Sequence, residues 1–120
     1  MTTVIRQAAA ASLDDVAAQL RDAFTEAQRA VDSGEPIVVI ANGADLLGQG
    51  SVEDGAVAGG LLGLVRALTF EGGRKGWHIN LVAVDRGTEP DPELLAAAGI
   101  PTLNGQVLNA SSGHIGKVIP

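Results

Sequence analysis

The stretch from Gly43 to Gly50 (GADLLGQG) is the part of the sequence that comes nearest to a ligand-binding motif. It follows an apolar run and precedes a stretch of helical periodicity, which is where a phosphate-binding loop lies in α/β proteins. Its glycine spacing fits neither G-x-G-x-x-G nor the P-loop, and no Lys-Ser or Lys-Thr pair follows Gly50. We therefore favour a plain crossover loop and keep phosphate or nucleotide binding as an alternative.

Titratable side chains elsewhere give weaker signals. Glu53 and Asp54 could serve as an acid/base pair, but both fall in the first turn of an expected helix, where the helix dipole favours negative charge. His78 and His114 are far apart in the sequence and have no acidic neighbours at ligand spacing, so no metal site is predicted. With no cysteine, the chain has no thiolate nucleophile and no disulfide.

Composition narrows the classes of partner. The net charge is -6, the pI is about 4.6 and the eight Lys and Arg residues form no basic run, which disfavours nucleic acid or an anionic membrane surface as a partner. Neither a leader-like N-terminus nor an apolar run of roughly 18 residues is present. We expect a cytoplasmic protein with no membrane segment, and one domain covering residues 1–120, since 120 residues suffice for a single core.

The order of expected elements predicts an α/β fold. Long helices are expected from the N-cap candidates Ser12 and Ser51, because apolar residues recur after each at helical spacing. Strands are expected at 2–7, 36–42, 78–84 and 106–110, and a short helix at 92–98. Alternating strands and helices of this kind predict three layers, with about four parallel strands flanked by helices.

The helix expected from about residue 52 to 74 carries small residues at four-residue steps. Each interior glycine costs roughly 0.5 to 1 kcal/mol relative to alanine, so such a stripe indicates close packing by another helix. That helix belongs either to the same chain or to another subunit, and we favour the subunit. The predicted interface consists of Gly55, Gly59, Leu62, Gly63, Arg66 and Ala67 on this helix, with Val107 and Asn109 on the last strand.

Residues 59–84 (GGLLGLVRALTFEGGRKGWHINLVAV) read as a helix, a glycine turn and a buried strand. They resemble the second half of a short-chain dehydrogenase/reductase, where a helix ending in A-x-E-x-x-x-x-G leads to a strand reading I-R-V-N-x-V-x-P-G. The segment 103–109 (LNGQVLN) is similar to the family's L-T-G-Q-V ending. The resemblance covers most of residues 36–120 and implies a truncated Rossmann-like domain.

Positions that carry the family's chemistry are vacant in this sequence. The family binds NAD(P) with a glycine-rich first unit, which has no counterpart here, and it uses a serine together with a Y-x-x-x-K pair. By the resemblance, the tyrosine position falls at Asp54, the lysine position at Ala58, and the serine position at Ala41 or Asn42. We therefore expect no catalytic residue, no cofactor-binding residue and no cofactor in the isolated chain.

Three functions follow as hypotheses. The first is a catalytically inactive subunit that forms a homo-oligomer, or a hetero-oligomer with a full-length active member of the family, whose equivalent helix lies in a four-helix bundle between subunits. The second is a subunit of an NAD(P)-dependent oxidoreductase whose cofactor and catalytic residues come from the partner chain. The third is a small-molecule or nucleotide binding module that uses residues 43–50.

The first strand is expected to be an open edge. In the family, the strand equivalent to residues 2–7 pairs with a strand of the cofactor-binding unit, which this sequence lacks. Exposed edges invite pairing with other chains unless they are short, charged or covered. This strand is short and carries the charge of Arg6, and both features would disfavour pairing of its edge with other chains.

Overall fold

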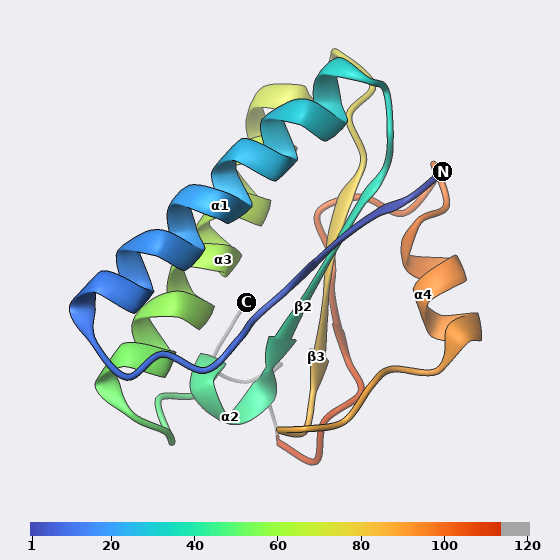
Figure 1. Cartoon of the computed structure of the whole chain (residues 1–120). Coiled ribbons are helices and arrows are strands. Elements are labelled where there is room, and N and C mark those ends of the chain that lie inside the picture. Colours follow the sequence, from blue (N-terminus) through green and yellow to red (C-terminus); the bar gives the residue numbers. More distant parts are fainter. Residues whose placement is uncertain (114–120) are drawn as a thin grey trace.

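In the computed structural model, which describes residues 1–113, four parallel strands form one sheet in the order β1-β2-β3-β4 (Figure 1). Helices α1 and α3 cover one face of the sheet and α4 covers the other (Figure 1). The strands are β1 (Thr3–Arg6), β2 (Ile37–Asn42), β3 (Ile79–Val84) and β4 (Val107–Asn109), and the helices are α1 (Leu13–Asp32), α2 (Gly43–Leu46), α3 (Val52–Gly72) and α4 (Pro92–Ala98). The predicted three-layer α/β fold with four parallel strands is confirmed.

The core lies on both faces of the sheet. Strands β2 and β3 are buried almost throughout, as expected for central strands of a parallel sheet. Ile37, Val39 and Leu81 pack toward α1 and α3, whereas Val38 and Val82 pack toward α4. None of the helices within residues 1–113 combines the length and apolarity that a membrane span needs.

Both predicted N-caps are confirmed. The Ser12 hydroxyl accepts a hydrogen bond from the Asp15 amide, and the Ser51 hydroxyl accepts one from the Asp54 amide, each at 3.1 Å. Such a cap satisfies an amide that has no partner inside the helix, and its loss typically costs about 1 kcal/mol. The capping serines therefore set where α1 and α3 begin.

The segment 43–50 differs from the plain loop that the sequence predicted, because Gly43–Leu46 forms the short helix α2. Four residues are too few to show helical periodicity, so no pattern in the sequence marks this turn. Only Gly48, at a φ of 75°, adopts the left-handed conformation that favours glycine within this stretch. His114, for which no metal-binding role was predicted, lies outside the described residues.

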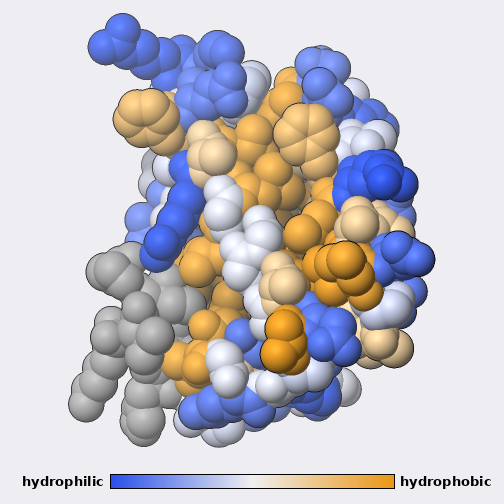
Figure 2. Space-filling view, turned by 90° about the vertical axis from the view of Figure 1, so that its left-hand side faces the viewer, coloured by the Kyte–Doolittle hydropathy of each residue, from blue (hydrophilic) through white to orange (hydrophobic). Residues whose placement is uncertain are grey.

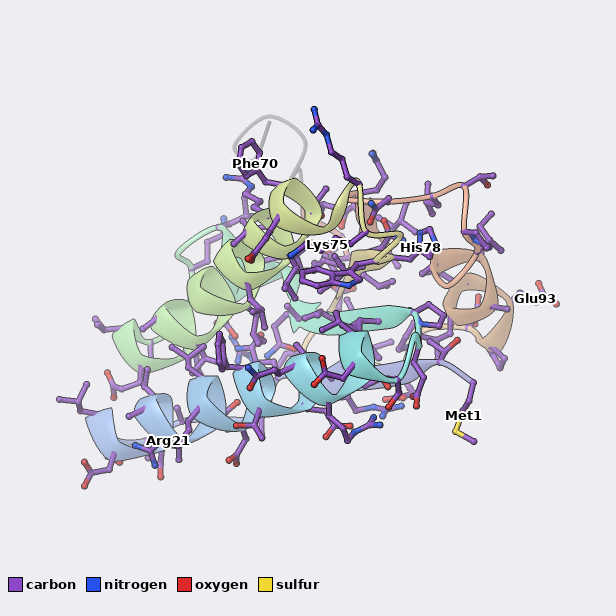
Figure 3. The ribbon with its side chains drawn as sticks, turned by 90° about the horizontal axis from the view of Figure 1, so that it is seen from above. Met1, Arg21, Phe70, Lys75, His78 and Glu93 are labelled. Atoms are coloured by element: carbon purple, nitrogen blue, oxygen red, sulfur yellow. The ribbon has the colours of Figure 1, made fainter. Side chains whose placement is uncertain are left out.

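The end of α3 depends on a close contact between Gly72 and Trp77. A Cβ at Gly72 would overlap the indole ring and lie 2.7 Å from the Trp77 Cβ, while the Trp77 amide donates to the Gly72 carbonyl at 3.2 Å. Lys75 holds its ammonium group 4.7 Å from the centre of the same ring, at the end of α3 seen in Figure 3. The turn can therefore close only over a residue without a side chain.

We expect Gly72→Ala to lower the free energy of unfolding by about 1 to 3 kcal/mol, because the added methyl group must displace the indole or the backbone. Urea denaturation would measure the change. Gly73→Ala is the matched control, since its Cβ would meet only the Thr69 carbonyl oxygen, at 3.5 Å. Equal stability of the two variants would contradict the role given to the contact with Trp77.

Candidate functional site

Polar side chains from distant parts of the chain meet at the carboxyl edge of the sheet. Gln7 follows β1, Asn42 ends β2, and Arg86 comes two residues after β3. Ligand sites of open α/β sheets form at this edge, where the loops after neighbouring strands converge. It is therefore the first place to look for a functional site.

Asp45 of α2 is the centre of this group, and its side chain is fully buried. Arg86 binds it with two nitrogens, Nη2 donating to Oδ1 at 2.7 Å and Nη1 donating to Oδ2 at 3.1 Å. The side-chain amides of Gln7 and Asn42 donate to the same Oδ2 at 2.9 and 3.0 Å. Four hydrogen bonds thus hold one buried carboxylate, an arrangement that satisfies its charge.

Asp54, in the first turn of α3, is the second carboxylate of the group. Its Oδ1 accepts a hydrogen bond from the Ala10 amide at 2.9 Å, and its Oδ2 lies 3.5 Å from Nη1 of Arg86. The Gln7 side chain also donates to the Asp54 carbonyl and accepts from the Asn42 amide. We call Gln7, Asn42, Asp45, Asp54 and Arg86 the Asp45 network.

The network holds its charges in place and leaves little capacity for chemistry. Burial raises the pKa of Asp45, but the hydrogen bonds from Arg86, Asn42 and Gln7 outweigh burial and leave the pKa below its usual range. The hydrogen bond with Asp45 in turn raises the pKa of Arg86. A general base works best with a pKa near the operating pH, so Asp45 is poorly suited to proton transfer at neutral pH.

Gly50 closes the loop over the network. A Cβ at this position would overlap the Asp45 carboxylate and lie 2.9 Å from the Arg86 Nη2. The backbone of segment 43–50 therefore packs against the carboxylate of Asp45 and the guanidinium of Arg86, and the negative charge of Asp45 disfavours a phosphate group here. Arg86 is already engaged by Asp45 and Asp54.

The sequence-predicted interface residues lie in two places. On α3, Gly59, Gly63, Arg66 and Ala67 are exposed, while Gly55 and Leu62 are half-buried. On β4, Val107 is half-buried against the core beneath α1 and α3, and Asn109 is exposed and bonded to Ser111 and Gly113. The structure therefore leaves most of the predicted helix positions open to solvent.

The positions at which the resemblance places the family's serine, tyrosine and lysine lie in two settings. Ala41 and Ala58 are fully buried and apolar, and Asn42 and Asp54 belong to the Asp45 network. Among residues 1–113 no group of three or more His, Asp or Glu side chains is placed to hold a metal ion. The Nδ1 atom of His78 is buried and has no partner among the same residues.

Apolar side chains are exposed along α1 and α3. Phe70 points outward from the end of α3 (Figure 3) and is 93% exposed. Phe24 of α1 is 58% exposed. Figure 2 shows a band of apolar surface running down this side of the molecule between polar flanks. A hollow of about 210 Å³ between the two helices is lined by Phe24, Ala27, Gln28, Val31, Leu64, Leu68, Glu71 and Trp77. We call this exposed side of α1 and α3 the helical face.

Known proteins were compared with the chain at the levels of sequence and structure. No protein-family model matches the sequence, and neither does any curated protein. Among solved structures, the peroxisomal multifunctional enzyme type 2 from Drosophila melanogaster is similar with a TM-score of 0.70 and 18% identity over 89% of this chain and 26% of that chain. The fold is that of the short-chain dehydrogenases and reductases.

Two further structures support this fold. The enoyl-[acyl-carrier-protein] reductase (NADH) from Aquifex aeolicus has a TM-score of 0.67 and 14% identity over 93% of this chain and 61% of that chain. A short-chain dehydrogenase from Bacillus anthracis has a TM-score of 0.62 and 17% identity over 92% of this chain and 63% of that chain. The present chain thus spans less than two thirds of the length of each solved structure compared here.

The Asp45 network was not predicted from the sequence. Its members come from positions up to 79 residues apart, Gln7 and Arg86 being the most distant, and no motif spacing joins them. The available signal was positional: a polar residue ends or closely follows each of the first three strands, and the carboxyl ends of parallel strands share one edge.

Proposed function

We propose that the chain is a catalytically silent subunit with the short-chain dehydrogenase fold, which associates through its helical face with a second copy of itself or with a full-length active relative. The observation that carries the proposal is that two glycines inside the 21-residue helix α3 are exposed and have no close neighbours. Gly59 and Gly63 are exposed, and no described atom lies within 4 Å of the Cβ that either would carry. Packing within residues 1–113 therefore does not explain why these two positions are glycine.

Gly60, the neighbour of Gly59, lies against the chain's own helix α1. A Cβ there would lie 2.6 Å from the Leu20 Cδ2 of α1, so a larger residue would have to displace the end of the Leu20 side chain. Each interior helical glycine costs roughly 0.5 to 1 kcal/mol relative to alanine. Contacts with α1 do not offset this loss of helix stability at Gly59 and Gly63. A partner helix that packs closely against both glycines would offset it.

The exposed aromatic rings favour the same surface. Phe24 and Phe70 account for both phenylalanines of the chain, and both are exposed on the helical face. Contiguous apolar surface of this kind usually marks an interaction site. Burial of an aromatic side chain contributes strongly to association, because it removes a large apolar area from water.

The absence of catalysis is supported by the side chains at the family's active positions. Asp54 and Ala58 stand where the resemblance places the tyrosine and lysine, and Ala58 is fully buried. Asp54 is engaged by the Ala10 amide and by Arg86. The Asp45 network holds a satisfied ion pair at the carboxyl edge, so none of its five residues is a free proton donor for catalysis.

Gly63→Leu is expected to weaken association about fivefold to 150-fold, because an overpacked contact typically costs about 1 to 3 kcal/mol. Gly63→Ala should instead raise the stability of the isolated chain by roughly 0.5 to 1 kcal/mol. Ala97→Leu on α4 is the control, since it also places a leucine at an exposed small residue, on the opposite side of the sheet. Light scattering and analytical ultracentrifugation would measure association.

The same measurements decide among partners. The mass would be determined for the purified chain alone and after co-expression with a dehydrogenase encoded beside it. A homo-oligomer that Gly63→Leu dissociates supports self-association, and a defined complex with the dehydrogenase supports a hetero-oligomer. A chain that is monomeric under both conditions contradicts the proposal. NAD(P)-dependent turnover that requires residues of this chain within a complex would contradict the silent role.

A further inference from the structure

Strand β1 has an open outer edge. It pairs with β2 only, through bonds such as that from the Thr3 amide to the Pro36 carbonyl and that from the Gln7 amide to the Ile40 carbonyl, both at 2.9 Å. Backbone groups alternate in direction along a strand, so those of Val4 and Arg6 point away from β2. No strand among residues 1–113 pairs with this outer edge.

A hollow of about 400 Å³ lies beside the open edge. Its lining comes from β1 and the residue that follows it closely (Val4, Ile5, Arg6, Ala8), from α1 (Gln19, Asp22, Ala23, Glu26) and from α3 (Leu61). Ile5, Ala23 and Leu61 are at most 7% exposed and make an apolar floor. Free backbone groups beside an apolar hollow are what an added strand requires, because it pairs through its main chain and inserts alternate side chains.

The rim of the hollow has an excess of negative charge. Arg6 is paired with Glu89, and Glu26 is paired with Arg29 at 2.8 Å. Asp22 is exposed and takes part in no ion pair within the described part of the chain. A strand with basic side chains would complement this rim, whereas a second copy would bring another Asp22 and a further net charge of -6.

We propose that the β1 edge binds an extended segment of a different protein, with alternating apolar and basic residues, as an additional strand of the sheet. The segment's main chain pairs with the backbone groups of Val4 and Arg6. Its apolar side chains enter the hollow over Ile5 and Leu61, and its basic side chains lie near Asp22. This site uses the opposite flank of α1 from the helical face and is independent of association there.

The test uses the isotope-labelled full chain and two capped hexapeptides, one alternating valine with lysine and one alternating valine with glutamate. The lysine peptide is expected to shift the NMR signals of the Val4 and Arg6 amides and to bind about tenfold more tightly than the glutamate peptide. Val4→Pro should reduce binding of the lysine peptide at least tenfold, because it removes an amide that faces the open edge rather than β2. Val4→Thr is the matched control, since it keeps that amide.

Asp22→Lys provides a second test that does not alter the strand. It should reverse the preference, so that the glutamate peptide binds more tightly than the lysine peptide. Equal binding of both peptides, or shifts confined to other parts of the chain, would overturn the proposal. Protection of the Val4 and Arg6 amides that grows with the concentration of the chain alone would also overturn it, because the occupant would then be a second copy.

Discussion

Replacing Asn80 by leucine is expected to lower the free energy of unfolding by about 3 kcal/mol or more. Asn80 lies in β3 and is fully buried. Its side-chain amide donates to the carbonyls of Ala98 and Leu103 at 2.8 and 2.7 Å, and its oxygen accepts from the Gln106 amide at 3.0 Å. A buried backbone group left without a partner costs about 1 to 3 kcal/mol. The substitution removes the partner of the buried Ala98 carbonyl and of the two part-buried groups of Leu103 and Gln106.

Urea denaturation of Asn80→Leu would measure this loss. Asn109→Ala is the control, because Asn109 is exposed on the neighbouring strand and its side chain, within residues 1–113, bonds only to Ser111 and Gly113 of the loop that follows. Its effect should stay below about 1 kcal/mol. If Asn80→Leu proved as mild as the control, Asn80 would not be what joins the segment from α4 to β4 onto the sheet.

The central strands were predictable because strands that are buried on both faces consist mainly of apolar residues. Strands β2 and β3 face α1 and α3 on one side and α4 on the other, so their sequences are nearly continuous apolar runs. Strand β4 is a three-residue edge strand in which Val107 and Leu108 are half-buried and Asn109 is exposed, and the sequence predicted it one residue too long at each end. Pairing to one neighbour, and not periodicity, decides where such a strand stops.

The stripe of small residues on α3 could be recognised in the sequence, but the contacts of each glycine could not. Gly59 and Gly60 are adjacent, and the sequence does not distinguish their surroundings. The structure separates them, because a Cβ at Gly60 would collide with Leu20 of α1 whereas a Cβ at Gly59 meets no described atom within 4 Å. The side of α3 that α1 covers follows from the crossing of the two helices, which one-dimensional spacing does not encode.

The Asp45 network could not be predicted from the sequence for a related reason. Its contacts span 38 residues between Gln7 and Asp45, and 41 between Asp45 and Arg86. Only the order of the strands brings these positions to one edge. The first-turn location predicted for Asp54 is confirmed, while its contacts with Ala10 and Arg86 depend on that tertiary arrangement.

Asp45→Asn is expected to lower the free energy of unfolding by about 2 kcal/mol at pH 7. Removing one member of a buried ion pair typically costs about 3 to 5 kcal/mol, and the smaller figure applies because Arg86 is 49% exposed and can be hydrated. The amide keeps the shape of the side chain, so Gln7 and Asn42 retain a partner while the charge is lost. Urea denaturation at a series of pH values would measure the difference from the wild type.

That difference should shrink in acid. The folded-state pKa of Asp45 lies below its unfolded-state value, so the ionised carboxylate contributes stability above an unfolded pKa of about 3.9 and loses it as the pH falls through the folded pKa. The substituted amide does not titrate. The pKa values of Glu26, Glu35 and Asp85 are also lowered, by hydrogen bonds from Arg29, Thr3 and Ser112 respectively, but these groups titrate in both proteins and cancel in the comparison.

Two outcomes would separate the charge of Asp45 from its shape. A difference that stays constant from pH 7 to pH 3 would mean that hydrogen-bond geometry, and not ionisation, is what the substitution disturbs. Asp14→Asn, at an exposed position of α1, should change stability by no more than about 0.5 kcal/mol at any pH. Because the network lies at the carboxyl edge and Gly63 lies exposed on α3, Asp45→Asn should leave association unchanged wherever the variant is folded, whereas Gly63→Leu should weaken association without lowering the stability of the isolated chain.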